Sequence, residues 1–533
     1  MKLLDIFKSK PKPEIKSKVF DRLYPYQKDA VETTITNSRG IICMPTGVGK
    51  TFCQASIIAD DIVKNSKEFR IYVVNAPRIM LSYQLLKEVY GFLMNEGIEA
   101  RYMFVHSGGK TDEKELELVR LKSKNEDGDI IKYSEIGSGT SPISIKEMML
   151  KAKAQKLPLI FFSTYNSAQR IEEARKIANI KQSISIVLND EAHYLVQEQF
   201  HDILTTLPSS RCFFFTATMI KTPSDKGRGM NNVESYGNVL YSMTPRQAID
   251  IGKMVRPRIH YVVTDGIYTT DDYEKNLNKI IADTFRQHEE VLAKTNQTPK
   301  ILISTKGTEE IREFVGIDAT HSSKEYNDLR NAGVDIYAVS STTEIGNQIN
   351  GKRVKRQEFL KCLKRDGEDR TKKLIVLHYD ILAEGIDVSG FTGIMPLRTL
   401  NKSKFLQTFG RSARPDKEDR KRIDNKEITP NDLDKLNKPY SYIIIPTIIK
   451  TNEDNKANLE LLITELRSEY GYDPSEYIMS AERTKGLPER EMEDKIPIQV
   501  RHVGEVIDDL NYKVEAEELA KLTKKQRAEK KYF

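Results

Sequence analysis

The chain has few cysteines and no long apolar run. Its 533 residues include four cysteines, none with a Cys-x-x-Cys spacing. Cys43 and Cys212 sit in apolar runs of the kind that form buried strands, so we expect reduced core residues rather than a zinc site. No apolar run approaches the roughly 20 residues that a membrane-spanning helix needs, so the composition does not favour a membrane protein.

The amino-terminal residues lack the features of a signal peptide. The apolar stretch Leu3-Leu4-Asp5-Ile6-Phe7 is short and is followed at once by lysines and prolines, so we expect a cytoplasmic location, in a bacterium or in the host cell of a virus. This stretch loosely resembles the short peptides that dock on replication clamps, although it has no leading glutamine. A loose amphipathic end is the simpler interpretation.

The charge and the length of the chain limit its possible partners and its number of domains. The chain carries 84 basic and 77 acidic side chains, a net charge of +7 that permits a polyanionic partner without requiring one. Between Lys521 and Phe533 six basic residues face the single acid Glu529. Such a run is more often a solvated end than a dedicated nucleic-acid contact. At this length we expect at least two domains.

Continuous apolar, β-branched runs alternate with longer helical patterns in both halves. Runs of this type suit parallel strands that are covered on both faces, which is the doubly wound α/β architecture. The predicted strands of the first half are 40–43, 71–74, 159–162, 184–188 and 212–215. Those of the second half are 301–303, 336–339, 373–377, 393–395 and 442–445.

The two series predict two tandem α/β domains with appendages. The boundaries we expect are an amino-terminal tail at 1–20, a first domain at 21–250, a second at 251–450 and a small, mainly helical extension with a basic tail at 451–533. A charged, Gly/Ser-punctuated stretch at about 108–156 is typical of a surface insertion. The stretch 416–438 is expected to project as a loop before the last strand.

The segment Met44-Pro45-Thr46-Gly47-Val48-Gly49-Lys50-Thr51 has the composition of a phosphate-binding loop. Glycines let backbone amides point at phosphates, a lysine supplies positive charge, and a hydroxyl can hold Mg²⁺. A predicted strand precedes the segment and a helical pattern follows it, as such a loop requires. We therefore expect ATP to contact Thr46, Gly47, Val48, Gly49, Lys50 and Thr51. Met44 stands where the general pattern has its first glycine.

An acid pair follows the predicted strand 184–188. Asp190 and Glu191 come at the carboxyl end of that strand, where α/β proteins place ligands. Asp190, together with Thr51, is expected to hold Mg²⁺, and Glu191 to orient and deprotonate the attacking water. His193 has no second histidine or cysteine at a metal-binding spacing, so a coupling role is expected for it.

Together with Thr216-Ala217-Thr218 and the segment 407–414, these motifs resemble superfamily 2 DExH-type helicases, in the group shared by restriction-enzyme motor subunits and DNA-repair or fork-remodelling helicases. The resemblance covers roughly Arg22 to Ile445 and implies two RecA-like domains. It implies that Gln27 reads adenine while Tyr24 or Arg22 stacks on the base. It also implies that Gln407, Arg411 and Arg414 reach the γ-phosphoryl group, and that Gly385 and Asp387 close beneath the nucleotide.

The resemblance also implies how nucleic acid is held. Thr216 and Thr218 would link the state of the nucleotide to the grip on the strand. Contacts to the phosphodiester backbone are expected at strand ends, where hydroxyls and amides bind phosphates without reading sequence. The residues at these positions are Arg78, Thr164, Tyr165, Thr305 and Ser341.

Three functions remain open at this stage. The first is an ATP-dependent DNA helicase or translocase, expected to be a monomer and to act on single-stranded, forked or duplex DNA in repair or replication. The second is a motor subunit of a restriction or antiviral defence complex that translocates without unwinding, in contact with replication or defence proteins. The third is an RNA helicase, because Asp-Glu-Ala-His occurs in motors on both nucleic acids. A binding scaffold with a decayed ATPase is disfavoured by the intact set of Lys50, Asp190, Glu191 and Arg411.

Overall fold

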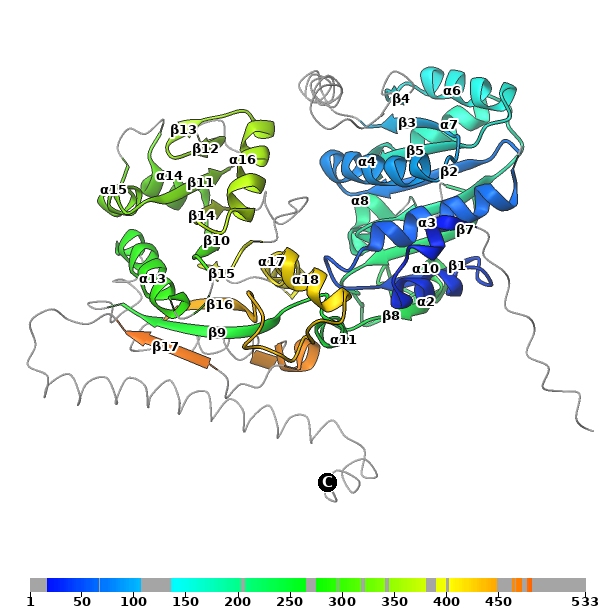
Figure 1. Cartoon of the computed structure of the whole chain (residues 1–533). Helices are drawn as coiled ribbons and strands as arrows, with labels where there is room; N and C mark the ends of the chain where they lie inside the picture. Colours follow the sequence, from blue (N-terminus) through cyan, green and yellow to red (C-terminus); the bar gives the residue numbers. More distant parts are fainter. Residues whose placement is uncertain are drawn as a thin grey trace, which may run out of the picture. The chain divides into compact units, whose positions relative to one another are not determined.

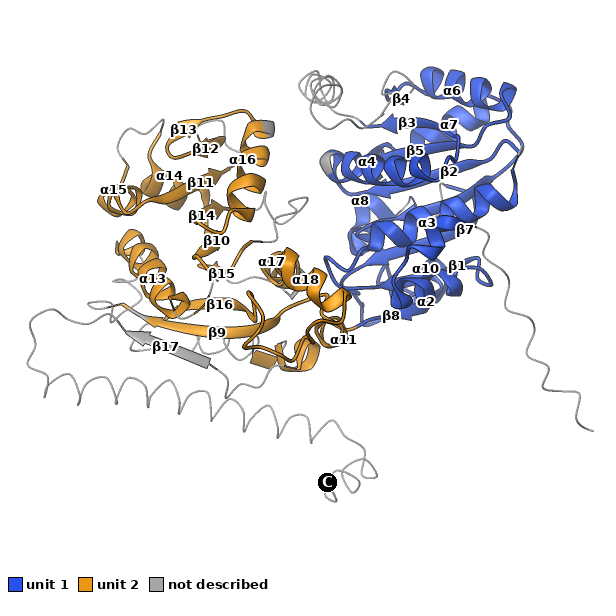
Figure 2. Cartoon of the chain, in the orientation of Figure 1, with its two compact units in different colours: residues 1–243 blue, residues 244–533 orange. Residues whose placement is uncertain are grey.

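The computed structural model divides the chain into two compact units, residues Met1–Met243 and Thr244–Phe533 (Figure 2). The residues that it describes are 17–66, 68–106, 136–201, 203, 207–264, 275–293, 295, 297–317, 322–340, 345–379, 390–398, 402–447, 463–464, 466–471 and 477–481. All statements below refer to these residues.

Unit 1 is built on a sheet with strand order β4-β3-β5-β2-β6-β7-β1-β8, in which every described pairing is parallel. The central strands β2, β5 and β6 are buried along their whole length. This explains the continuous apolar runs, because both faces of these strands must be covered. The strands are β1 (Arg39–Cys43), β2 (Ile71–Ala76), β3 (Arg101–Val105), β4 (Ile136–Ser138), β5 (Leu159–Thr164), β6 (Ile184–Asn189), β7 (Ser209–Thr216) and β8 (Asn238–Ser242).

Helices cover both faces of this sheet (Figure 1). One core joins alternate strand residues such as Val73 and Phe161 to Ile145 and Ile171 on α6 and α7, while α3 packs on α2 and α4. The helices are α1 (Lys18–Asp21), α2 (Pro25–Thr33), α3 (Lys50–Lys64), α4 (Ile79–Asn95), α6 (Pro142–Ala154), η2 (Tyr165–Ser167), α7 (Gln169–Ile177), η3 (Ala192–Val196), α8 (Glu198–His201) and α10 (Val233–Tyr236).

Unit 2 repeats the plan with strand order β13-β12-β11-β14-β10-β15-β16-β9-β17. Its central pairings are parallel, and an antiparallel hairpin, β12–β13, extends one edge. The strands are β9 (Arg256–Val263), β10 (Lys300–Ser304), β11 (Val334–Val339), β12 (Asn347–Ile349), β13 (Lys352–Arg353), β14 (Lys373–His378), β15 (Gly393–Pro396), β16 (Tyr440–Thr447) and β17 (Tyr477–Ala481).

The core of unit 2 lies between this sheet and α13, α14 and α15, where Phe285, Phe314 and Tyr326 pack on Ile301 and Ile375. The helices are α11 (Pro245–Asp250), α13 (Leu277–Leu292), α14 (Thr308–Val315), α15 (Lys324–Asn331), α16 (Arg356–Glu368), α17 (Lys402–Ser412) and α18 (Lys417–Asp424).

The predicted doubly wound α/β architecture is confirmed, and all ten predicted strands lie within strands of the two sheets. Three expectations were wrong in part. The stretch 416–438, expected to project as a loop, contains the helix α18 and a buried Asp419, which accepts from the backbone N–H groups of Asn437 and Lys438. Residues 136–156, placed in a surface insertion, form β4 and α6, and α6 buries Ile145 and Met149 in the core of unit 1. The extension after residue 450, predicted as mainly helical, contributes the strand β17, which pairs with β9. The basic run 521–533 lies outside the described residues.

None of the helices among the described residues has the length and apolar character that crossing a bilayer demands. The four cysteines are free thiols. Cys212 on β7 is buried, as expected of a core residue, whereas Cys43 at the end of β1 is only half-buried.

Candidate active site

The phosphate-binding loop connects β1 to α3 in unit 1. Gly47 and Gly49 have φ angles of 86° and 88°, a conformation that other residues rarely adopt. A Cβ atom on Gly49 would also lie 2.4 Å from Nε2 of Gln27. Lys50 begins α3 and is buried, with its Nζ 3.3 Å from the carbonyl oxygen of Met44 and 3.5 Å from that of Pro45. The ammonium group therefore lies over the loop in which a phosphate group would be held.

The side chain of Gln27 holds this loop through hydrogen bonds. It is 3% exposed, and its Nε2 donates to the carbonyl oxygen of Val48 at 2.9 Å. Its Oε1 accepts from the backbone N–H of Tyr24 at 3.0 Å, and Tyr26 Oη donates to the same Val48 oxygen. The amide of Gln27 is thus engaged with the loop on one side and with the start of α2 on the other. Adenine recognition by Gln27 stays a prediction.

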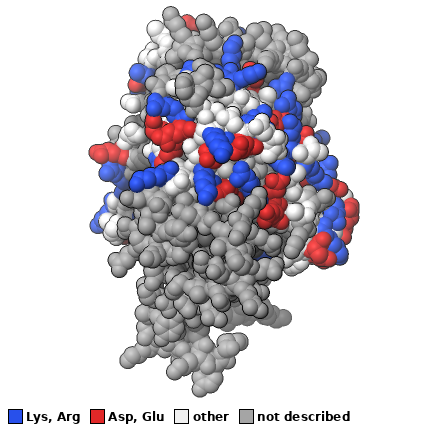
Figure 3. Space-filling view, turned by 90° about the vertical axis from the view of Figure 1, so that its left-hand side faces the viewer, with Lys and Arg blue, Asp and Glu red and all other residues white. Residues whose placement is uncertain are grey.

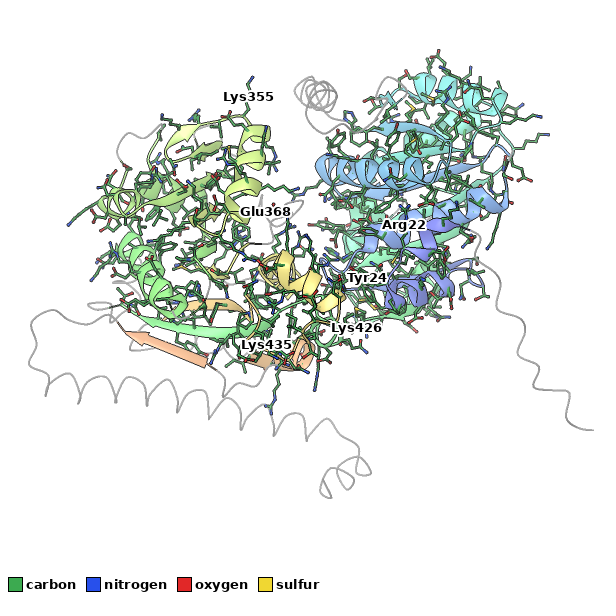
Figure 4. All side chains as sticks on the ribbon, in the orientation of Figure 1. Arg22, Tyr24, Lys355, Glu368, Lys426 and Lys435 are labelled. Carbon is green, nitrogen blue, oxygen red and sulfur yellow. The ribbon has the colours of Figure 1, made fainter. Side chains whose placement is uncertain are left out.

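The two candidates for stacking on adenine lie nearby on the surface of unit 1 (Figure 4). Tyr24 is half-buried and stacks on Tyr26, with ring centroids 5.7 Å apart. Arg22 is exposed and forms an ion pair with Glu96, its Nη2 lying 2.9 Å from Oε1. Tyr24 therefore offers a flat ring held by a neighbour, whereas Arg22 would have to leave Glu96 in order to stack.

The acid pair lies at the carboxyl end of β6, as predicted. The backbone N–H of Asp190 donates to the carbonyl oxygen of Asn75 at 2.8 Å, which ties the pair to the end of β2. Gln54 on α3, one turn after Lys50, donates from Nε2 to Oδ1 of Asp190 at 2.8 Å. The same helix therefore carries the lysine of the loop and a donor to the acid, and it joins the two motifs within unit 1.

Burial makes Asp190 an unusual carboxyl group. Burial, and next the negative charge of Glu191, raise the pKa of Asp190 from 3.8 to about 7, against the opposing effect of Lys50. A divalent cation would stabilise the ionised form that burial disfavours. Mg²⁺ commonly takes one carboxylate together with waters and phosphate oxygens, and Asp190 and the hydroxyl of Thr51 fit that donor set. The described residues contain no cluster of three or more His, Cys, Asp or Glu side chains that could form a separate all-protein metal site.

Glu191, the second residue of the acid pair, and His193 lie between Asp190 and strand β7. Glu191 has a φ angle of 48°, a left-handed conformation that a glutamate seldom adopts, so the turn after β6 holds it under strain. Its Oε2 lies 3.5 Å from Nδ1 of His193, and that nitrogen lies 3.2 Å from Oγ1 of Thr216. Burial lowers the pKa of His193, so this ring is neutral at pH 7, and both contacts are made by the same nitrogen, Nδ1.

Thr216 completes the path. Its Oγ1 donates to the carbonyl oxygen of Thr218 at 2.8 Å and accepts from the backbone N–H of Thr218 at 3.1 Å. Its own carbonyl oxygen accepts from the N–H of Met44, at the start of the phosphate-binding loop. The structure therefore brings together the loop, the acid pair and the Thr216-Ala217-Thr218 segment in one hydrogen-bonded assembly inside unit 1.

The predicted contacts to nucleic acid differ in their surroundings. Arg78 is exposed at the start of α4. Thr164 is buried, and its Oγ1 donates to Oγ of Ser167 at 3.1 Å, while Thr305 donates from Oγ1 to the carbonyl oxygen of Gly307 at 2.8 Å. Ser341 lies outside the described residues. A backbone-contact role for Arg78, Thr164, Thr305 and Ser341 stays a prediction.

Tyr165 requires a correction. Its side chain is 1% exposed, and its hydroxyl donates to the carbonyl oxygen of Asp190 at 2.5 Å. A ring enclosed in the core of unit 1 has no face to offer a nucleic acid, so the direct contact predicted for Tyr165 is not supported. The side chain instead fixes the backbone at the acid pair.

The arginine motif lies in unit 2, on α17 and in the turn that follows it. Gln407 and Arg411 are on the helix, and Arg414 comes two residues after its end. The end of the helix is held by Lys438, whose Nζ donates to the carbonyl oxygens of Ser412 and Arg414, each at 2.7 Å. Burial lowers the pKa of Lys438 to about 7. Gly385 and Asp387 lie outside the described residues, and the convergence of Lys50 with Arg411 and Arg414 stays a prediction.

Three functional contributors were missed from the sequence: Gln54, Tyr165 in its supporting role, and Lys438. Helical spacing offered a signal for Gln54, because it lies four residues after Lys50 and so shares a face of α3 with it. Lys438 offered no signal, because it lies in a segment predicted to project as a loop and reaches the end of α17 only through the fold of unit 2.

The sequence was compared with known proteins and their structures. Residues 21–221 match the family model described as "Type III restriction enzyme, res subunit". No curated protein sequence shows a significant match to the chain.

Two solved structures of type ISP enzymes share the fold. One is described as the "ATP-dependent Type ISP restriction-modification enzyme LlaBIII bound to DNA" (TM-score 0.61, 18% identity, 92% of this chain and 33% of that one). The other is a nuclease-deletion mutant of the type ISP enzyme LlaGI in complex with a DNA substrate mimic (TM-score 0.52, 18% identity, 84% of this chain and 29% of that one). The chain spans about a third of the length of these proteins. Residues 21–221 thus resemble the res subunit of restriction enzymes, and the chain resembles superfamily 2 helicases of the restriction-subunit group, as its motifs predicted.

Proposed function

We propose that the chain is an ATP-dependent DNA helicase or translocase that couples ATP hydrolysis to sequence-independent movement on duplex or branched DNA, with unwinding or remodelling of that DNA. The observation that carries the proposal is the hydrogen-bonded assembly in unit 1. It links the phosphate-binding loop through Gln54 to Asp190, and it links His193 to Thr216, with Nδ1 of His193 also 3.5 Å from Oε2 of Glu191. A domain that only binds a nucleotide needs the phosphate-binding loop. It does not need contacts that connect the region of the acid pair to Thr216 at the end of β7.

The chemistry proposed for the assembly is hydrolysis of ATP. Lys50 and the loop amides would hold the phosphates, Asp190 and Thr51 would hold Mg²⁺, and Glu191 would take the proton of the attacking water. Arg411 and Arg414 of unit 2 would stabilise charge on the γ-phosphoryl group. A planar guanidinium suits this role because it spreads its charge over several oxygens.

Movement would follow from the division of these groups between two units. ATP binding would close the units around the nucleotide, and hydrolysis would let them separate while the backbone contacts at the strand ends alternate. Contacts of this kind bind phosphates without reading bases, so we expect no sequence preference.

Glu191→Gln tests the proposal. The variant should bind ATP with unchanged affinity, whereas the DNA-stimulated turnover should fall by roughly 10²–10⁴ because the base is lost. ATP hydrolysis would be measured with single-stranded DNA, duplex, forked DNA and RNA, and strand separation on the fork. Glu147→Gln, an exposed glutamate on α6, is the matched control. Retained unwinding by Glu191→Gln would refute the assignment, and stimulation by RNA alone would favour the RNA helicase.

A second candidate is a motor subunit of a restriction or antiviral defence complex that translocates on DNA without unwinding it. The match of residues 21–221 to the res-subunit family favours it, as does the likeness to part of two larger type ISP enzymes. The two candidates are distinguished by strand separation on a fork, which only the helicase should catalyse. The translocase should instead show duplex-stimulated ATP hydrolysis and displacement of a bound obstacle.

A further inference from the structure

One segment of unit 2 carries charge of almost a single sign. We call residues 352–365, which comprise β13 and the first ten residues of α16, the α16 strip. Its only acid is Glu358. Its seven basic residues are Lys352, Arg353, Lys355, Arg356, Lys361, Lys364 and Arg365, of which all but the half-buried Arg356 are exposed. We propose that the α16 strip binds the phosphodiester backbone of duplex DNA, which extends the function proposed above by a second contact surface.

The charge of the strip is not an average property of the chain. Seven basic residues less one acid give +6, whereas the whole 533-residue chain has a net charge of +7. On the face of the molecule in Figure 3, basic and acidic side chains are interspersed. A local excess of this size attracts polyanions and makes their binding dependent on salt.

Folding explains only part of the choice of residues. Arg365 pairs with Asp366, which directly follows the strip, with its Nε 2.7 Å from Oδ1. Helix α16 packs through Phe359 and Leu363, which are 1% and 0% exposed, and these positions account for its apolar face. Lys361 is three residues before Lys364, and like charges at this spacing weaken a helix. At the other end, Lys355 is the N-cap residue, where its side chain makes no capping hydrogen bond and where the helix dipole favours acids. A bound phosphate would offset both the repulsion between the lysines and the unfavourable position of Lys355 at the start of the helix.

The topology places the strip beside the predicted nucleic-acid contacts of unit 2. Strand β13 is the outermost strand of the sheet, and α16 is part of the crossover from β11 to β14, which are parallel. The helix therefore starts near the carboxyl ends of the strands, the edge that carries Thr305, and runs back along the sheet. Figure 4 shows Lys355 projecting outward from unit 2. The ten helical residues of the strip span about 15 Å, the length of roughly four base pairs.

The strip favours duplex over unpaired nucleic acid. Proteins that bind single strands combine positive charge with exposed aromatic rings on which bases stack. The one aromatic residue in the strip is Phe359, which is buried. The surface therefore offers charge for phosphates but no ring for bases.

The test removes three lysines of the strip at once. The strip variant Lys352→Gln/Lys355→Gln/Lys364→Gln changes three exposed side chains, and the control variant Lys151→Gln/Lys153→Gln/Lys156→Gln makes the same charge change at and just after α6 in unit 1. Duplex affinity would be measured on the full chain from 50 to 300 mM salt, with thermal unfolding as a check on folding. The strip variant should bind duplex about tenfold more weakly at 100 mM salt, and its slope of log K against log salt should fall by about 2–3.

The control variant should keep the affinity within twofold of the unmodified chain and should leave the slope unchanged. Equal losses in the two variants would overturn the proposal, and so would a loss confined to single-stranded DNA. DNA-stimulated ATP hydrolysis separates this inference from the proposed function. The unmodified chain could show no DNA-stimulated hydrolysis while the strip variant still loses duplex affinity. In that case the proposed motor function would be wrong, and the α16 strip would still be a DNA-binding surface.

Discussion

Replacing Asp190 by asparagine should stabilise the chain when neither Mg²⁺ nor nucleotide is present. Asparagine keeps an oxygen that can accept from Gln54 Nε2, the 2.8 Å hydrogen bond of the native carboxylate, but it removes the buried charge. The folded chain holds the pKa of Asp190 at about 7, against an ordinary 3.8. A carboxyl group with a raised pKa binds a proton more tightly in the folded chain than in the unfolded one, so native stability falls as the pH rises from about 4 to about 7.

The size of the effect follows from that pKa. Each pKa unit corresponds to about 1.4 kcal/mol, so a rise of roughly three units sets an upper bound of about 4 kcal/mol. Relaxation of the site reduces this, and we expect Asp190→Asn to gain on the order of 2 kcal/mol at pH 8. At pH 4 the native carboxyl group is largely protonated, so the variant and the native chain should have nearly equal stability.

The assay is urea unfolding followed by circular dichroism, because the chain contains no tryptophan to serve as a fluorescent probe. Unfolding would be measured with EDTA at pH 4, 5.5, 7 and 8. Asp225→Asn, which removes an exposed carboxylate of unit 1, is the control and should show no such pH-dependent gain. A gain of equal size at all four pH values, or no gain at pH 8, would refute the reasoning. In return, Mg²⁺ with ADP should raise the unfolding temperature of the native chain more than that of the variant.

Three other changes probe the remaining parts of the site. Tyr165→Phe removes the buried donor to the Asp190 carbonyl oxygen and should lower the free energy of unfolding in urea by about 1–3 kcal/mol, with DNA affinity unchanged. A loss of DNA affinity at full stability would instead support a direct contact between Tyr165 and DNA. Thr216→Val removes the hydroxyl that contacts His193 and Thr218. The variant should show roughly tenfold less stimulation of ATP hydrolysis by DNA at unchanged ATP affinity. Normal stimulation would show that Thr216 has no part in coupling. Arg414→Ala should lower kcat for ATP by about 10³ or more with KM nearly unchanged, and normal turnover would exclude it from the site.

The strands were predictable because burial on both faces leaves a strong local signal. The run 159–162 is apolar at every position and the run 184–188 at all but Ser185, as expected for strands that are covered on both sides. The edge strands were missed for the opposite reason. Strand β13 is the exposed dipeptide Lys352-Arg353, and β8 is largely exposed, so neither carries a pattern that distinguishes it from a loop. The pairing of β17 with β9 depends on contacts between distant segments.

The active site was predictable where the chemistry depends on residues close in sequence. The loop from Thr46 to Thr51 and the pair Asp190 and Glu191 could be read directly, because each motif sits next to a predicted strand. The sequence did not show what surrounds them. The burial that raises the pKa of Asp190, and the carbonyl oxygen that makes Tyr165 a supporting residue, both arise from packing between segments about 25 or more residues apart.

Strand β7 provides a physical reason to expect coupling through Thr216 rather than through the acid pair alone. The strand is parallel to β1 and to β6, so its carboxyl end lies between the phosphate-binding loop and the acid pair. The carbonyl oxygen of Thr216 accepts from Met44, and its hydroxyl contacts His193. A shift of the loop therefore changes the hydrogen bond from Met44 to Thr216, and a shift of His193 changes the contact with the Thr216 hydroxyl. Because that hydroxyl also bonds both the N–H and the carbonyl oxygen of Thr218, the change passes to the segment that follows β7.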